Sequence, residues 1–244
     1  MRARLQNKQT KFISFSGIDG AGKSTQIDRL WARMEDMGLI VHVVQFWDDV
    51  ATLTRLRESG ARALFKGDGG VGSPSAPINR RDKNVQTWPM TIVRLCTYLV
   101  DAVSIFFFVR KALRSEVDVI IFDRYIYDEL ANLNLRNTLL RTYARLIAAL
   151  VPVPDLALIV DAIPSEARAR KPEYPLEFLV TCRSSYLCLS DLIGGMTVIA
   201  PMPARETERE VLRAAAGILP QLAGSLTVPA FAVPAPPSEV DSVA

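Results

Sequence analysis

The 244-residue chain has little cysteine, a single histidine and little net charge. Its three cysteines form no Cys-x-x-Cys pair and leave one thiol unpaired, which favours a reducing, cytoplasmic setting over a disulfide framework. Lys and Arg total 29 against 26 acidic residues, so the net charge is only +3. Proteins that bind nucleic acids or membrane surfaces usually concentrate far more positive charge. We therefore expect neither kind of partner.

Long hydrophobic runs are scarce as well. The most strongly apolar stretch, residues 105–109, is too short to span a bilayer, and Asp101 and Arg110 bracket it. The basic residues 1–11 precede a strand-like segment and not an apolar signal core. We therefore predict no membrane anchor.

The overall composition is that of a folded globular protein. Apolar residues make up 49% of the chain and charged residues 23%. From about residue 223 the chain is rich in Pro, Ala and Val without periodicity. We predict one domain over residues 1–222, followed by a disordered tail over 223–244.

Apolar runs of strand length alternate with segments of helical periodicity. Strands are expected at residues 12–15, 39–46, 117–122, 156–160 and 196–200. Helices are expected at residues 27–34, 91–114, 139–150, 176–192 and 206–219, with a further one beginning near Pro164. This alternation predicts an α/β fold in which a parallel β-sheet carries helices on both faces. Ligands bind such sheets at the carboxyl ends of the strands.

Residues 17–24, Gly-Ile-Asp-Gly-Ala-Gly-Lys-Ser, match the phosphate-loop pattern G-x-x-x-x-G-K-[ST] in full, between a predicted strand and a predicted helix. In such a loop the backbone N–H groups point at phosphate oxygens. The lysine reaches the β- and γ-phosphates, and the serine hydroxyl holds Mg²⁺. The pattern predicts a P-loop nucleoside triphosphate hydrolase fold with ATP and Mg²⁺ as ligands. The predicted ATP-binding residues are Gly17, Ile18, Asp19, Gly20, Ala21, Gly22, Lys23, Ser24 and Thr25.

Several motifs together resemble the thymidylate kinase family. The loop has an acid at its third place and Ser-Thr-Gln after the lysine, and residues 120–125 resemble the family's Asp-Arg-Tyr motif. Residues 154–167 resemble its fourth strand and the helix that opens the lid, and Phe178, Arg183 and Tyr186 echo its next helix. The resemblance covers roughly residues 12–46 and 117–220.

The resemblance implies roles for individual side chains. Asp123 would lie near Mg²⁺ together with Ser24, and Arg124 would bind a transferring or acceptor phosphate. Asp19 would orient the acceptor or the metal. A short lid, residues 164–175, would supply Arg170 to neutralise charge that builds on the phosphoryl oxygens. With Lys23, these arginines and Asp19 are the predicted catalytic residues.

The chain departs from the family on the acceptor side. Thymidylate kinases carry an Arg-Pro run after the second strand, where this chain has Asp48 and Asp49. The family also has an arginine that contacts thymine. The corresponding position in this chain is near Asp101, and Arg94 lies two helical turns earlier. These four residues are the acceptor-site candidates. Residues 47–90 read as a long acceptor-side loop region of the kind that is usually functional or mobile.

Three functions stay open. The first is a kinase for a nucleoside monophosphate, with dTMP as the default acceptor by resemblance. The second is a kinase for a hydroxyl of a nucleoside, sugar or other metabolite, with Asp48 or Asp49 as base. The third is a nucleotide-binding module without catalysis, which the intact loop and the Asp-Arg pair argue against. The order of the motifs favours the first. A homodimer, typical of that family, is a further expectation, with the apolar middle helix as a candidate interface.

Overall fold

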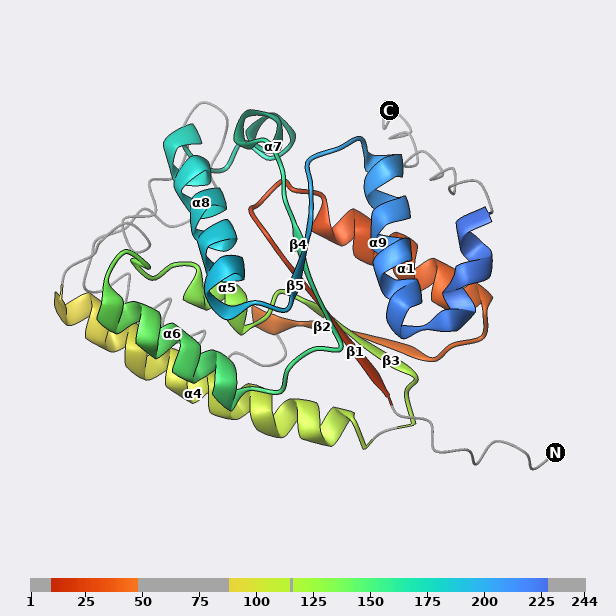
Figure 1. Cartoon of the computed structure of the whole chain (residues 1–244), viewed down its shortest axis with the longest axis horizontal. Coiled ribbons are helices and arrows are strands. Elements are labelled where there is room, and N and C mark those ends of the chain that lie inside the picture. Colours follow the sequence, from red (N-terminus) through yellow and green to blue (C-terminus); the bar gives the residue numbers. More distant parts are fainter. Residues whose placement is uncertain (1–9, 48–87, 115, 228–244) are drawn as a thin grey trace, which may run out of the picture.

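A computed structural model of the chain describes residues 10–47, 88–114 and 116–227. Five parallel strands form one central sheet between two layers of helices (Figure 1). The predicted acceptor-side loop lies outside the described residues, apart from its ends at residues 47 and 88–90. The predicted α/β architecture is confirmed.

The sheet has the strand order β2-β3-β1-β4-β5. In chain order, the strands are β1 (Lys11–Ser16), β2 (Val41–Gln45), β3 (Val119–Asp123), β4 (Leu156–Val160) and β5 (Met196–Ile199). The three inner strands are almost wholly buried, because helices cover both faces of the sheet. Pairing places Phe15 beside Asp123 and Ser16 beside Ile159. The carboxyl ends of the inner strands therefore meet at one edge.

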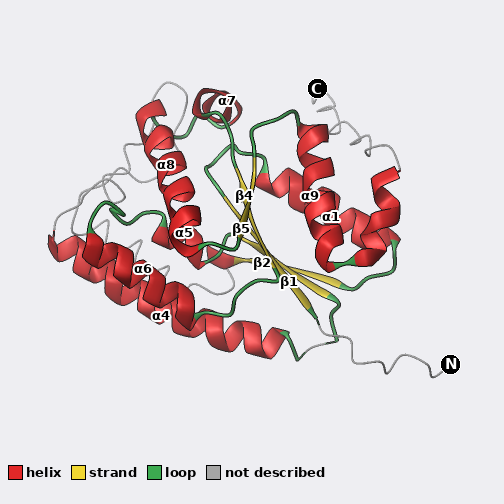
Figure 2. Cartoon of the chain, viewed as in Figure 1, coloured by secondary structure: helices red, strands yellow, loops and turns green. Residues whose placement is uncertain are grey.

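Helices cover both faces of the sheet (Figure 2). One face carries α1 (Lys23–Asp36), α9 (Ala204–Ile218) and the 3₁₀ helix η2 (Pro220–Thr227). The other carries α4 (Trp88–Ala112), α5 (Ile126–Leu130), α6 (Thr138–Leu150) and α8 (Leu176–Ile193). The short helix α7 (Pro164–Arg170) sits above the carboxyl end of β4. Proline at its first position suits a helix start, because no backbone N–H is needed there.

Two helices were not predicted from the sequence. Helix α5 has only five residues, too few to show a helical period, yet all five are buried. Helix η2 continues past the boundary predicted at residue 222, and Leu222 itself is fully buried. Helical structure therefore extends to Thr227, while residues 228–244 of the predicted tail lie outside the described residues.

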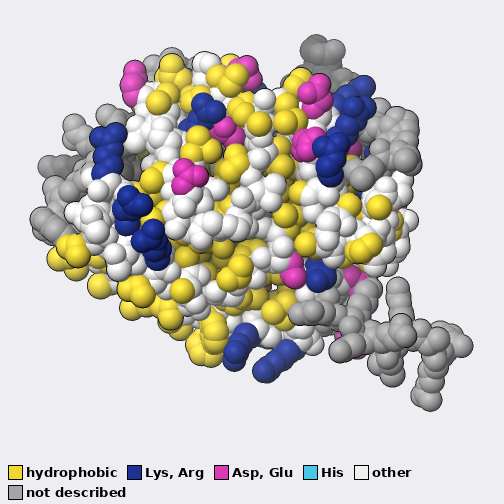
Figure 3. Space-filling model, in the orientation of Figure 1, with side chains coloured by type: hydrophobic (Ala, Val, Ile, Leu, Met, Phe, Trp, Pro, Cys, Tyr) yellow, Lys and Arg dark blue, Asp and Glu magenta, His cyan; other side chains and the backbone are white. Residues whose placement is uncertain are grey.

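Helix α4 leaves many apolar side chains exposed. Figure 3 shows hydrophobic side chains gathered along the edge of the molecule where α4 runs. The most exposed of them are Ile92, Val93, Leu99, Val103 and Phe107. Residues 91–112 are long and apolar enough to cross a membrane, with mean hydropathy 2.0 and 28% of the window buried. Length and composition alone do not distinguish a spanning helix from an apolar helix of a soluble protein, so the absence of a membrane anchor stays a prediction.

A buried ion-pair cluster joins α1 to α9. The carboxylate of Glu208, which is 2% exposed, lies 3.0 Å from Arg29 and 3.7 Å from Arg33. Both arginines have mostly buried side chains. One carboxylate therefore pairs with two guanidinium groups at the interface of these helices.

Glu208→Gln should destabilise the fold by about 3 kcal/mol, because it leaves two largely buried guanidinium groups without this counter-charge. The free energy of unfolding is measured by denaturant titration. Glu210→Gln is the matched control, since Glu210 lies on the same helix in an exposed pair with Arg213. It should cost at most about 0.5 kcal/mol. Equal losses from the two variants would contradict the buried role of Glu208.

Candidate active site

The phosphate loop follows β1 and packs closely against the backbone at the end of β4 and in α7. Gly17 and Gly20 have φ values of +140° and +79°, in the left-handed region that favours glycine. A Cβ on Gly17 would lie 2.4 Å from the carbonyl oxygen of Val160, and one on Gly20 would lie 2.2 Å from that of Ala167. Both positions therefore require glycine, and the loop is held between the end of β4 and helix α7.

The loop ends on the amino terminus of α1, which is a suitable site for an anion. Gly22 is the N-cap residue, and it has no side chain to cap the helix. The N–H groups of that turn and the positive end of the helix dipole therefore face the loop. This arrangement is the usual anion-binding device at a helix start.

Lys23 lies folded into the loop. Its Nζ donates hydrogen bonds to the carbonyl oxygens of Gly17 at 2.8 Å and Ile18 at 3.0 Å, and the residue is 6% exposed. Burial, reinforced by the charge of Arg124, lowers the pKa of Lys23 to about 8. A bound polyphosphate would favour the ammonium form over the neutral amine.

Ser24 and Asp123 form a small oxygen-rich site beside the loop. The Ser24 hydroxyl lies 3.4 Å from the Asp123 carboxylate, because the β1–β3 register sets Asp123 next to Phe15. Such hard oxygen donors suit Mg²⁺, which takes few protein ligands and completes its shell with phosphate and water. The described residues contain no cluster of three or more His, Cys, Asp or Glu, the kind of cluster that could hold a metal on protein ligands alone. The predicted pair fits a nucleotide-borne Mg²⁺.

Arg124 is held by backbone and side chain together. Its φ of +72° is the one positive value among the described non-glycine residues, a conformation that costs roughly 1 kcal/mol or more. Its N–H donates to the carbonyl of Phe15 at 2.9 Å. The guanidinium pairs with Asp19 of the loop and lies 3.4 Å from Asp128. Burial works against the charged form, but the two carboxylates outweigh it and raise the pKa of Arg124.

Asp128 joins three elements around Arg124. One carboxylate oxygen accepts from the Ser16 hydroxyl at 2.7 Å and the Tyr125 N–H at 3.1 Å. The other accepts from the Tyr186 hydroxyl at 2.7 Å and faces Arg124. Burial, and then the nearby Asp128 charge, raises the pKa of Tyr186. Sequence reasoning missed Asp128, and the one available signal was its place four residues after Arg124.

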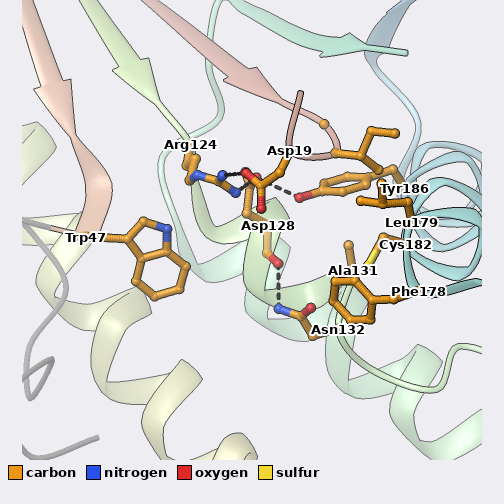
Figure 4. Close-up of a pocket in the computed structure, with 12 residues that line it drawn as sticks. Asp19, Trp47, Arg124, Asp128, Ala131, Asn132, Phe178, Leu179, Cys182 and Tyr186 are labelled. Carbon is orange, nitrogen blue, oxygen red and sulfur yellow. Dashed lines mark hydrogen bonds and ion pairs between the residues drawn. The ribbon is translucent and has the colours of Figure 1, made fainter. Parts of the chain in front are cut away.

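A small hollow that is open to solvent lies beside the loop (Figure 4). Residues of the loop, of β2's end, of the Arg124–Asp128 region and of α8 line it. The lining residues are Gly17, Ile18, Asp19, Trp47, Arg124, Asp128, Ala131, Asn132, Phe178, Leu179, Cys182 and Tyr186. A second, larger hollow of about 150 Å³ is lined by Arg94 among others, and Asn132 lines both hollows. The two hollows are therefore neighbours at Asn132.

The remaining predicted site residues fall into three groups. Arg170 on α7 reaches the loop, since its Nη1 lies 3.9 Å from the position that a Cβ on Gly22 would occupy. Arg94 faces the second hollow, whereas Asp101 is fully buried on α4 and lines neither hollow. Asp48 and Asp49 lie outside the described residues. The structure thus brings Asp19, Lys23, Ser24, Asp123, Arg124 and Arg170 around one loop.

Comparison with known proteins supports the fold. No protein-family model matches the chain, and no curated protein matches it. Among solved structures, a thymidylate kinase from Ehrlichia chaffeensis is similar, with a TM-score of 0.52 and 21% sequence identity. The match covers 85% of this chain and 99% of that kinase. At this identity the likeness shows the fold, which is the P-loop kinase fold predicted from the sequence.

Because the pKa of Lys23 is lowered, contact between Lys23 and a bound phosphate can be detected as proton uptake. In the free protein at about pH 9, a lysine with a pKa of about 8 is largely neutral. Binding of the Mg²⁺ complex of a non-hydrolysable ATP analogue should restore the ammonium and take up close to one proton. Near pH 7 the uptake should be small, because the amine is already protonated. Titration calorimetry in buffers of different ionisation enthalpy measures the uptake.

Lys23→Arg is the control for this experiment. A guanidinium stays protonated at both pH values, so this variant should bind the analogue without taking up a proton at about pH 9. Equal uptake by the variant and the parent protein would show that another group carries the proton.

Proposed function

We propose that this protein is an ATP-dependent phosphotransferase that uses Mg²⁺. One observation carries the proposal: the uncapped start of α1, with Lys23 beside it, faces Asp123 and Arg124 across the same edge of the sheet. A triphosphate-binding loop that merely holds a nucleotide has no need of an arginine positioned by two carboxylates. The arrangement therefore favours catalysis over the non-catalytic binding module.

Each of these side chains has a task in phosphoryl transfer. The loop amides and Lys23 hold the β- and γ-phosphates, and Ser24 and Asp123 hold Mg²⁺ directly or through water. When bound, Mg²⁺ would neutralise charge on the phosphates. Arg170, above the loop, places a cation beside the oxygens of the transferring group and helps α7 to exclude water.

The acceptor is a small molecule, and dTMP is the first candidate. The order of the sequence motifs and the likeness to the Ehrlichia chaffeensis thymidylate kinase support it. The second candidate is a hydroxyl compound, and the two carboxylates in the hollow beside the loop, Asp19 and Asp128, favour it. A cytoplasmic location, a homodimer and the absence of nucleic-acid and membrane partners stay predictions.

Lys23→Ala should lower turnover by about 10²–10³-fold, because the variant loses the cation at the transferring phosphoryl group. ADP release in the presence of Mg-ATP and a panel of acceptors measures the rate, and thermal unfolding checks the fold. A variant that keeps near-normal rates with an unchanged melting temperature would place the chemistry elsewhere.

Arg170→Ala should lower kcat by at least about tenfold with little change in the KM of the acceptor, because a lid arginine acts mainly in the transition state. Arg168→Ala, on the same short helix, is the matched control and should keep near-parental kcat. A change confined to the acceptor's KM would instead assign Arg170 to acceptor binding.

A further inference from the structure

An ion pair at the end of β4 joins this strand to helix α8. The Arg183 guanidinium on α8 holds the Asp161 carboxylate through two hydrogen bonds, from Nε and Nη2, each of 2.7 Å. Two such bonds fix the relative orientation of the partners as well as their distance. The Asp161 side chain is 7% exposed and that of Arg183 is 34% exposed. The pair therefore ties a buried strand end to a partly exposed side chain of α8.

Asp161 is the residue from which the chain leaves the sheet towards α7. Its N–H donates to the carbonyl of Ile199 on β5 at 3.0 Å, and its carboxylate accepts from the N–H of Ala162 at 2.8 Å. Residues 161–163 form the short connection between β4 and α7. By holding the Asp161 side chain, Arg183 therefore fixes the point at which this connection begins.

Helix α7 has few anchors of its own. Of its seven residues, Pro164 and Ala167 are buried. A short helix with so small a buried face gains little stability from packing, so its position depends on the segments that flank it. The connection that Arg183 holds is one of these segments.

The same part of the chain lies directly against the phosphate loop. Backbone carbonyls at the end of β4 and in α7 approach Gly17 and Gly20 so closely that a Cβ on either glycine would clash with them. Arg170 is the last residue of α7, and its guanidinium lies near Gly22 of the loop. A displacement of the connection would therefore move the Arg170 guanidinium relative to the loop.

Helix α8 has a second anchor near Arg124. Tyr186, three residues after Arg183, donates its hydroxyl to Asp128, which in turn pairs with Arg124 (Figure 4). Residues three apart on a helix lie on neighbouring turns of one side. One short stretch of α8 thus contacts the supports of both Arg124 and α7, and it sets the spacing between them.

We propose that Arg183 is a positioning residue for the transfer step: through Asp161 it holds α7 over the loop, so that Arg170 meets the γ-phosphoryl group. This inference rests on the proposed function and on the proposed role of Arg170. Arg183 is not among the described residues that line the two hollows. A catalytic group that is displaced by about 1 Å can lose about 100-fold in rate, so a remote support can have a large effect.

Arg183→Ala tests the proposal on the full-length protein. With Mg-ATP and the panel acceptor that the parent protein turns over fastest, kcat should fall by at least about fivefold, while the KM of Mg-ATP should change by less than about threefold. Arg183→Lys keeps a cation that can reach one carboxylate oxygen, and it should recover part of kcat. Arg213→Ala removes an exposed arginine that pairs with Glu210 on α9, and this control should keep the parental kcat.

A double variant distinguishes positioning from a general loss of structure. If Arg183 acts through Arg170, the protein with both Arg170→Ala and Arg183→Ala should match Arg170→Ala alone within about twofold in kcat. Losses that multiply in the double variant would show that Arg183 acts independently of Arg170, and they would overturn the proposal. An unchanged kcat in Arg183→Ala would overturn it as well. Thermal unfolding reports whether each variant is folded; were Arg183→Ala unfolded, Arg183→Lys would carry the same comparisons.

Amide hydrogen exchange tests the support of α7 without any turnover. The N–H groups of Ala167 and Lys171 donate to backbone carbonyls within and just before α7. In Arg183→Ala they should exchange at least about fivefold faster, whereas the amides of α1 should keep parental rates. Equal exchange of α7 in the two proteins would contradict the proposal. A parent protein that releases no ADP with any acceptor would instead refute the proposed function, and with it the role of Arg183 in transfer, while the exchange rates would still show whether Arg183 holds α7.

Discussion

The candidate site depends on one guanidinium held between two carboxylates. Arg124 ties the phosphate loop, through Asp19, to the short helix α5, through Asp128. Asp128 in turn accepts from Ser16 on the central strand and Tyr186 on α8. Elements from three distant parts of the sequence are thus fixed around a single cation: β1 with the loop that follows it, α5, and α8. The unfavourable backbone angle of Arg124 persists because these contacts over-determine its position.

The sequence predicts those features whose cause is local. The phosphate loop is recognised because its glycines, lysine and serine are consecutive, and the structure explains Gly17 and Gly20 by close approach of neighbouring backbone. The inner strands are recognised because their apolar runs are buried on both faces. Asp123 and Arg124 follow directly from a strand end, and the parallel register brings them to the loop.

Other features depend on distant contacts and were not predicted. Asp128 has its role because Ser16 and Tyr186, 112 and 58 residues away, both donate to it, and no local pattern encodes such a meeting. Helix α5 is too short for a periodic signal. Helix α4 reads as apolar throughout, and only the structure shows which of its side chains stay exposed.

The folded-back lysine has a consequence for how the loop meets its ligand. With its ammonium bound to the carbonyls of Gly17 and Ile18, Lys23 occupies the loop's own concavity and keeps the backbone in its curled shape. When a nucleotide binds, the Lys23 ammonium exchanges these carbonyl oxygens for phosphate oxygens. The loop backbone is already ordered before the nucleotide arrives. The gain in affinity then comes mainly from the stronger interaction of the ammonium with phosphate than with carbonyl oxygens. The protein loses little conformational entropy on binding. Until a nucleotide binds, the Lys23 side chain therefore keeps the loop in its curled conformation.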